Sequence, residues 1–433
     1  MSEHPRVSAS FPASEPSAIV PGQVVTVDAV SGARAVLVHE PGPLVATSLR
    51  FAAGSRDDDP GRSGLAHILE HMMFCGTQQL RRNGHMKVIQ SMGGFVNAKT
   101  SADWTKHFHV MPSDLISVLL TLEAERFTQT PTVMTDSALE IEREVVLNER
   151  RQTIENVAYG GAVETLVENL YPAGSRYHHL PIGSAADISR VSLADCLRFQ
   201  VGNYVGPRVN LAVVGGFDPA TTAAQVGDFL AVFGAGTAAP SQGTMAGQQA
   251  TRRVEITSPY RPKVYLGCLL PPAASWDFEL ARFAALFLGR GNSARLPEQL
   301  VRRDTVAVNV AVKTMARQHD KSVGIIELVP ADGVSPAQAL AALDKAMLSA
   351  IDGELGEHDL RRTKAVYRSS WLAEDDTLVG RSDSLSLSMQ QTGSVSSYFE
   401  HDARITDVRL EDLHRALEWW HQPLHRVELV YTR

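Results

Sequence analysis

The stretch from Ser63 to Gly76, SGLAHILEHMMFCG, decides how this chain is interpreted. Positions between Leu65 and Phe74 are apolar on nearly every side, which predicts a buried helix rather than an amphipathic surface helix. Ser63 can cap the start of the helix, and Gly76 can end it in the left-handed conformation that glycine adopts readily. We therefore expect a short buried helix with a defined start and end.

Three ionisable side chains interrupt this apolar helix. His67, Glu70 and His71 have the spacing i, i+3 and i+4, so a helix places them on one face. Burying a carboxylate beside two imidazoles without partners costs several kcal/mol. A divalent cation removes that penalty, because neutral imidazole is a good zinc ligand. The alternative is a pair of hydrogen-bonded core histidines, but H-x-x-E-H in a buried helix favours a metal site.

A catalytic zinc ion needs a third protein ligand and an open fourth position. The segment SALEIEREVVLNERRQ, which begins at Ser137, is expected to form a helix that starts with a capping box of Ser137 and Glu140. Glu142 and Glu149 lie seven residues apart on one face, so Glu149 could bind the metal while Glu142 supports a histidine. On spacing alone, an ordinary charged helix surface is the simpler explanation of this pair.

Composition and length narrow the class of protein. Of 433 residues, 44% are hydrophobic and 21% charged, which excludes fibrous and disordered classes and predicts two or three domains. The net charge of −7 argues against nucleic-acid binding. The sequence has no apolar run near the roughly 18 residues that span a bilayer, and no signal-peptide pattern. We expect a cytoplasmic protein without a membrane segment, a mature periplasmic form being the alternative.

The pattern of strands and helices repeats. Residues 1–20 predict a loose lead-in, and a hairpin turns at Ser31-Gly32. The uncharged residues 234–250 predict a linker, after which a strand–helix–strand order restarts. We predict an α+β fold with two homologous-looking domains, residues 21–233 and 251–433, each a mostly antiparallel sheet packed with helices.

These motifs resemble the pitrilysin/insulinase family of zinc peptidases, whose H-x-x-E-H motif is inverted relative to H-E-x-x-H. The resemblance rests on His67-x-x-Glu70-His71 and on the distant pair Glu142 and Glu149. It extends to GGFVNAKTSADWT, to the stretch starting LPIGSAADISRV and to LGRGNSARLPEQL in the second half, and so covers nearly the whole chain.

The resemblance implies a zinc endopeptidase with assigned roles. The metal ligands would be three side chains: His67, His71 and Glu149. Glu142 would support a histidine ligand without binding the metal itself. Glu70 would be the general base, which takes a proton from the water that attacks a peptide carbonyl. Asn97 and Ala98 would pair with the substrate backbone, as an added strand does. The family's usual spacing between the second histidine and the third ligand would place that ligand at Asn148, which binds zinc poorly. We therefore assume one inserted residue in the loops between them, which makes Glu149 the ligand.

A second departure concerns the other half of the site. Active family members carry Arg and Tyr seven residues apart in their second half, which orient substrate and stabilise the oxyanion. Aligning EQLVRRDTVAVNV places Val301 and Val308 there, with Arg302 and Arg303 nearby but no tyrosine.

The family's working unit is a clamshell of four domains, of which this chain would form half. The resemblance therefore implies a heterodimer whose homologous partner lacks the zinc motif and supplies Arg and Tyr, as in bacterial two-subunit peptidases and the mitochondrial processing peptidase. A homodimer is less favoured. A non-catalytic scaffold or peptide-binding subunit is the alternative of another class, against which the intact His67, Glu70 and His71 argue.

Two further features stay without an assigned role. His107 and His109 share one face of a predicted strand and could bind a metal, but no third ligand is evident, which favours packed or solvated side chains. Trp419-Trp420 fits an interface patch as well as a core.

Overall fold

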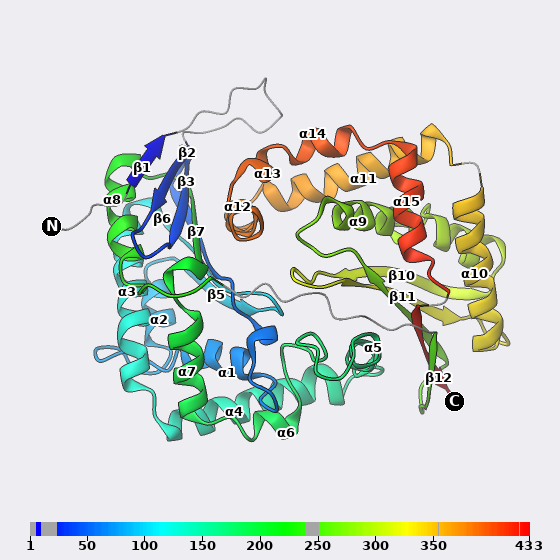
Figure 1. Cartoon of the computed structure of the whole chain (residues 1–433), viewed down its shortest axis with the longest axis horizontal. Helices are drawn as coiled ribbons and strands as arrows, with labels where there is room; N and C mark the ends of the chain where they lie inside the picture. The colour runs from blue at the N-terminus through cyan, green and yellow to red at the C-terminus, as the bar shows by residue number, and fades with distance from the viewer. Residues whose placement is uncertain (1–5, 10–23, 239–250, 354, 424) are drawn as a thin grey trace. The chain divides into compact units, whose positions relative to one another are not determined.

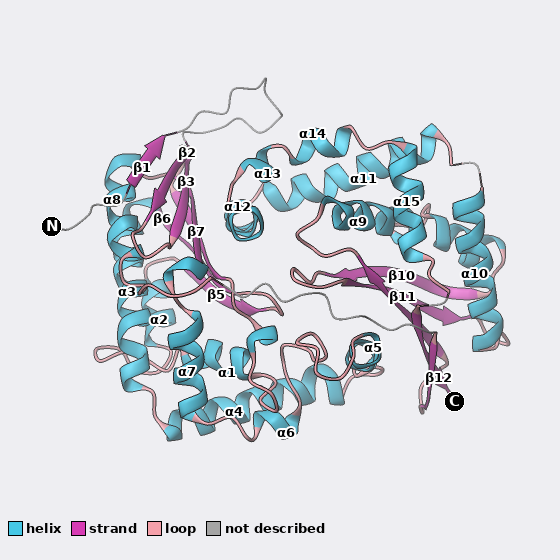
Figure 2. Ribbon diagram, viewed as in Figure 1, coloured by secondary structure: helices cyan, strands magenta, loops and turns pink. Residues whose placement is uncertain are grey.

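The computed structural model describes residues 6–9, 24–238, 251–353, 355–423 and 425–433. They form two compact units, each with one sheet and its own covering helices (Figures 1 and 2). This confirms the predicted α+β class with two sheet-containing parts. Three segments make up each unit: residues 1–151, 180–240 and 372–401 in the first, and residues 152–179, 241–371 and 402–433 in the second.

The units differ from the expected domains in two segments. Residues 152–179 join the second unit, where Leu166 and Leu170 pack against Gly267 of its sheet. Residues 372–401 return to the first unit as α12 (Leu378–Thr392), which packs on β4 and β7. Local sequence pattern does not predict these exchanges, because each depends on a surface formed elsewhere in the chain.

The two expected unstructured stretches are only partly described. In the lead-in, Arg6–Ala9 form β1, which pairs with β2, so this part of the prediction is wrong. The other lead-in residues, and residues 239–250 of the predicted linker, lie outside the described residues.

The first unit contains a seven-stranded sheet in the order β1-β2-β3-β7-β4-β6-β5. Its strands are β2 (Val24–Asp28), β3 (Arg34–His39), β4 (Leu44–Phe51), β5 (Phe95–Thr100), β6 (Thr105–Pro112) and β7 (Val209–Gly215). β2 and β3 form the predicted hairpin, with Gly32 at φ +90°. β7 is buried throughout between β3 and β4, as its continuous apolar sequence predicts. β5 is the edge strand at the end of the sheet opposite to β1, and it pairs with β6.

Helices cover both faces of this sheet (Figure 1). The helix layer of the core is built from α1 (Leu65–Met72), α2 (Gly84–Ser91), α3 (Ile116–Val133), α4 (Asp136–Arg150), α7 (Leu193–Asn203) and α8 (Pro219–Leu230). On the other face, α12 is held by polar contacts: Asp383 pairs with Arg50 of β4, and Ser386 lies 3.0 Å from Ser48.

The second unit contains a five-stranded sheet in the order β10-β11-β9-β12-β8. The strands are β8 (Arg252–Thr257), β9 (Lys263–Leu270), β10 (Ala307–Met315), β11 (Ser322–Pro330) and β12 (Arg426–Thr432). The apolar core lies between this sheet and α9 (Trp276–Gly289), α10 (Pro336–Asp352) and α15 (Leu410–Trp420). Trp420 is a core residue whose indole donates to the carbonyl of Ala281, while Trp419 packs at the margin of the same core.

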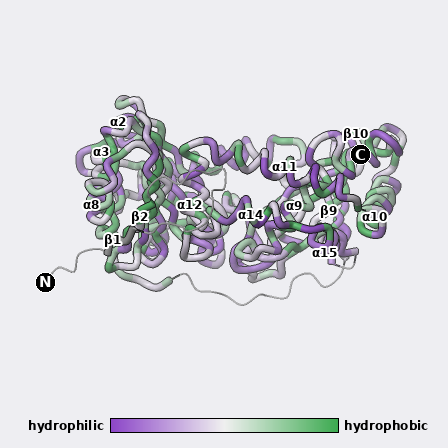
Figure 3. The backbone as a smooth tube through the Cα atoms, turned by 90° about the horizontal axis from the view of Figure 1, so that it is seen from above, coloured by the Kyte–Doolittle hydropathy of each residue, from purple (hydrophilic) through white to green (hydrophobic). Residues whose placement is uncertain are grey.

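Hydropathy alternates along the helices of both units. Figure 3 shows short apolar stretches interleaved with hydrophilic ones rather than long apolar runs. Among the described helices, none combines the length and apolar character that crossing a bilayer requires.

Candidate metal centre

α1 is a buried helix, as predicted, but the residue that caps its N-terminus differs from the prediction. Gly64, at φ +96°, precedes it, and the backbone N–H groups of Gly64 and Ala66 each donate to the Asp58 carboxylate at 2.8 Å. Asp58 therefore caps the helix, and the proposed Ser63 cap is wrong because that hydroxyl donates to Asp187 instead. The expected end at Gly76 is also wrong, because α1 ends at Met72 with Met73 as its cap, and Gly76, at φ +126°, lies beyond the helix.

α4, which carries the two glutamates, also starts two residues earlier than expected. Thr135 is its cap and accepts from the N–H of Ala138 at 3.2 Å, so the predicted capping box of Ser137 and Glu140 does not form. Glu140 pairs with Arg143 on the helix surface instead. The correction shifts the first turn but leaves Glu142 and Glu149 on one helix.

The structure brings together the three predicted metal ligands. His67 and His71 lie one turn apart on α1, with ring centroids 4.9 Å apart. Glu149, near the end of α4, places its Oε2 at 3.7 Å from Nε2 of His67 and 3.8 Å from Nε2 of His71. One ligand atom from each of these residues lies within 4.8 Å of the others. Asn148, the position reached by strict counting, instead accepts a hydrogen bond from Arg151.

Glu142 orients His71 from the side opposite to Glu149. Its Oε2 lies 3.5 Å from Nδ1 of His71, and its Oε1 lies 2.7 Å from the guanidinium of Arg82. Such a contact directs the other ring nitrogen toward the metal position. Burial opposes the charged form of His71, but the surrounding carboxylates, Glu142 foremost, outweigh it and raise the pKa of that imidazole.

His67 is more deeply buried than His71, with its side chain 13% exposed against 21%. Burial, followed by the nearby His71, lowers the pKa of His67 to about 3. The imidazole is therefore neutral at neutral pH, which is the state that binds a metal ion.

Glu70 lies beside the ligands, 8% exposed, and its Oε2 accepts a hydrogen bond from the hydroxyl of Thr100 on β5. Burial raises the pKa of Glu70, although the Thr100 bond opposes this rise. A carboxylate with a raised pKa is suited to accept a proton during a reaction. Glu70 also borders a cavity of about 230 Å³, whose other lining residues are His71, Phe74, Asn83, Met86, Asn97, Ala98 and Glu142.

Asn97 and Ala98 lie on the outermost strand at this cavity. Asn97 is exposed, and its Oδ1 accepts the backbone N–H of Ala98 at 2.8 Å. β5 has β6 on one side in the sheet order, so its other edge is where a further strand would pair.

The two arginines nearest to the expected substrate-orienting positions form ion pairs with a neighbouring glutamate. Arg302 and Arg303 both pair with Glu298, at 3.4 and 3.3 Å. Val308, on β10, is 49% exposed, and Val301 packs partly buried against the second core. Neither valine can donate a hydrogen bond to an oxyanion from its side chain.

Sequence reasoning missed three residues that hold the site: Asp58, Arg82 and Thr100. Thr100 could have been found, because strand alternation puts it on the same face as Ala98. Asp58 and Arg82 come from loops, whose side-chain directions leave no periodic signal in the sequence.

Comparison with known proteins matches one part of the chain to a family. Residues 34–183 match the family model described as Insulinase (Peptidase family M16). The chain therefore carries a domain of this peptidase family, which confirms the resemblance found in its sequence. The matched region contains α1 and α4.

Two relatives show how far the sequence similarity reaches. The zinc protease PqqE of Helicobacter pylori is 31% identical over 172 residues, which is 40% of this chain and 38% of that protein. The beta subunit of the mitochondrial-processing peptidase of Saccharomyces cerevisiae is 27% identical over 166 residues, 38% of this chain and 35% of that protein. The matches thus span less than two fifths of either relative.

Solved structures share the fold over nearly the full length. A protease from Helicobacter pylori superimposes with a TM-score of 0.87 and 21% identity, over 96% of this chain and 100% of that one. A peptidase M16 inactive domain from Pseudomonas fluorescens gives a TM-score of 0.84 with 18% identity, over 94% and 98%. Since one is titled a protease and the other inactive, the fold alone does not decide activity.

Proposed function

We propose that this chain is the metal-bearing subunit of a zinc-dependent endopeptidase. The proposal is carried by the convergence of His67, His71 and Glu149 within 4.8 Å beside buried Glu70. Two imidazoles and a carboxylate are a donor set that suits zinc and leaves a fourth position open. Zinc, when bound, would lower the pKa of water and polarise the peptide carbonyl.

The chain's own residues would then do the rest of the work. Glu70 accepts a proton from the attacking water and can return it to the leaving amine. Thr100 holds one oxygen of this carboxylate, which fixes the direction of the other. The free edge of β5, at Asn97 and Ala98, would hold the peptide as an added strand, for which the N–H of Ala98 must exchange its bond to Asn97.

A partner chain would complete the site. Val301 and Val308 occupy the positions where an arginine and a tyrosine were expected, so the oxyanion needs donors from elsewhere. We therefore propose a heterodimer with a homologous subunit that has no zinc motif. One relative is a beta subunit of a processing peptidase, which is consistent with such an arrangement.

The test is to purify the protein from its own cells and measure the mass of the native complex. A complex with a different chain of similar size, whose sequence carries Arg and Tyr seven residues apart, would support the split site. A homodimer that cleaves peptides would overturn the borrowed residues while leaving the zinc peptidase intact.

The alternative is a non-catalytic scaffold or peptide-binding subunit. It is favoured by Val301 and Val308 and by the similarity to an inactive domain. The two functions separate in one experiment: a scaffold would bind peptides with its partner and leave them uncut, and Glu70→Gln would change nothing.

A further inference from the structure

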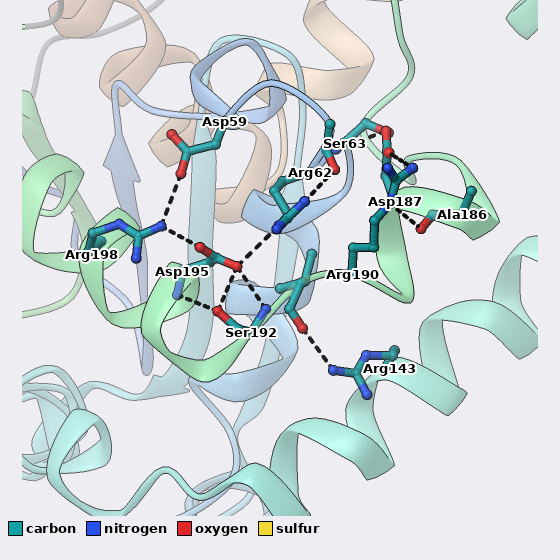
Figure 4. Close-up of polar contacts among 12 residues, drawn as sticks. Asp59, Arg62, Ser63, Arg143, Ala186, Asp187, Arg190, Ser192, Asp195 and Arg198 are labelled. Atoms are coloured by element: carbon teal, nitrogen blue, oxygen red, sulfur yellow. Dashed lines mark hydrogen bonds and ion pairs between the residues drawn. The ribbon is translucent and has the colours of Figure 1, made fainter.

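Residues 182–195, here termed the bracket, lie against both helices of the candidate metal centre. The bracket contains the short helix α6 (Ala185–Ile188) and the capping box of Ser192 and Asp195 that starts α7. Figure 4 shows its acidic side chains, Asp187 and Asp195, turned toward the residues that precede α1. Each of these two residues contacts a residue of its own segment and a residue that precedes α1.

One side of the bracket holds the start of α1. Asp187 accepts hydrogen bonds from the hydroxyl of Ser63 at 2.6 Å and from its N–H at 3.3 Å. Ser63 in turn accepts the N–H of Ser184 at 3.0 Å. Gly183, at φ +75°, packs so closely that a Cβ there would lie 2.2 Å from the Ser63 carbonyl oxygen. The backbones are therefore in direct contact.

The other side of the bracket holds α4. The guanidinium of Arg150 donates to the carbonyl of Gly183 at 2.7 Å, and that of Arg143 donates to the carbonyl of Val191 at 2.7 Å. Arg150 directly follows Glu149 in the chain. Gly183 thus contacts the start of α1 through its Cα and the end of α4 through its carbonyl oxygen.

The connection that the bracket makes between α1 and α4 bears on metal binding. A metal site tolerates deviations of only about 0.2 Å in ligand distance, and the ligands here come from two helices. Apolar packing between α1 and α4 is not directional, whereas hydrogen bonds constrain both distance and angle. We propose that the bracket sets the position of Glu149 relative to His67 and His71, with Arg150 and Asp187 as positioning residues.

This inference rests on the proposed zinc site, and the experiment is designed to separate the two. Zinc affinity of the full-length protein is measured by competition with a chromophoric chelator. We expect Arg150→Ala and Asp187→Asn each to weaken zinc binding roughly 10- to 100-fold, the range for residues that orient ligands. Arg415→Ala is the control, because Arg415 belongs to α15 of the second unit, where it pairs with Asp412 and Asp277, and its loss should leave zinc affinity unchanged.

A second background distinguishes positioning from general damage. In Glu149→Gln protein, which lacks the ligand that the bracket positions, Arg150→Ala should cause no further loss of zinc affinity. Equal losses in both backgrounds, or no loss in the native background, would overturn the bracket. If Arg150→Ala fails to fold, Arg150→Lys, which retains one donor group, should give a smaller loss of the same kind. Wild-type protein that binds no zinc would refute the proposed function instead.

Discussion

Two clusters in the first unit have the same composition, two histidines and one glutamate, with ligand atoms within 4.8 Å of one another. The first cluster is the candidate metal centre: His67, His71 and Glu149. The second cluster draws on α2, β6 and α3: His85, His109 and Glu123. The first borders a cavity through His71, and its Glu149 side chain is 42% exposed, whereas all three members of the second are buried.

Counter-charge separates the two clusters further. Both oxygens of Glu123 accept hydrogen bonds from Arg126, at 3.0 Å and 2.5 Å, and Nη1 of Arg126 lies 3.2 Å from His107. Glu123 and Arg126 form a buried ion pair whose charges cancel. A divalent cation bound there would add two positive charges that no buried group compensates among these residues. Residue type thus defines a set that could hold a metal, while burial and neighbouring charge decide whether it does.

The largest expected effect concerns the reaction at the first cluster. Glu70→Gln should lower peptide hydrolysis by about 10²- to 10⁴-fold, the usual contribution of a general base, while zinc content stays unchanged. The measurement is the rate at which the native complex hydrolyses a fluorescence-quenched peptide. Glu144→Gln, an exposed glutamate on α4, is the control. Unchanged turnover in Glu70→Gln would exclude it as the base.

Metal content tests the comparison directly. Wild-type protein should bind about one zinc ion per chain, at the first cluster. His71→Gln should abolish this binding, whereas His109→Gln should leave it intact, as measured by elemental analysis after dialysis. Two zinc ions per chain in the wild type, falling to one in His109→Gln, would show that Arg126 does not prevent metal binding.

Stability should respond to the second cluster instead. Arg126→Leu leaves Glu123 buried without its cation and should lower the free energy of unfolding by about 3–5 kcal/mol, measured in urea with EDTA present. The double variant Arg126→Leu/Glu123→Leu should regain much of this loss, because no buried charge remains. A double variant as unstable as the single one would argue against charge as the cause.

The smallest effect is a pH dependence. Burial, with Arg126 second, holds the pKa of His107 well below 6.5, so the folded state stays neutral where the unfolded state gains a proton. Stability is then full above pH 6.5 and falls as the pH drops below it, by about 1.4 kcal/mol per pH unit for one proton. His107→Asn, which keeps an acceptor for Arg126, should reduce this slope by that amount. An unchanged slope between pH 6.5 and 5.5 would assign the effect to other groups.

The sequence predicted those features that depend on neighbours along the chain. The apolar run of α1, the hairpin at Gly32 and the buried strand β7 each carry a local pattern, and the structure contains all three. The i, i+3, i+4 spacing also placed His67 and His71 on one face before any tertiary contact was known.

Tertiary structure decided what depends on distant residues. Asp58 rather than Ser63 caps α1 because a loop brings its carboxylate to the helix. Glu123, the third member of the second cluster, belongs to the helix α3 and approaches His109 only in the folded chain. The strand pattern around His109 therefore did not predict this contact. The return of residues 372–401 to the first sheet has the same origin. Helix and strand periods are local properties of a chain, whereas charge pairing and segment exchange exist only once remote surfaces meet.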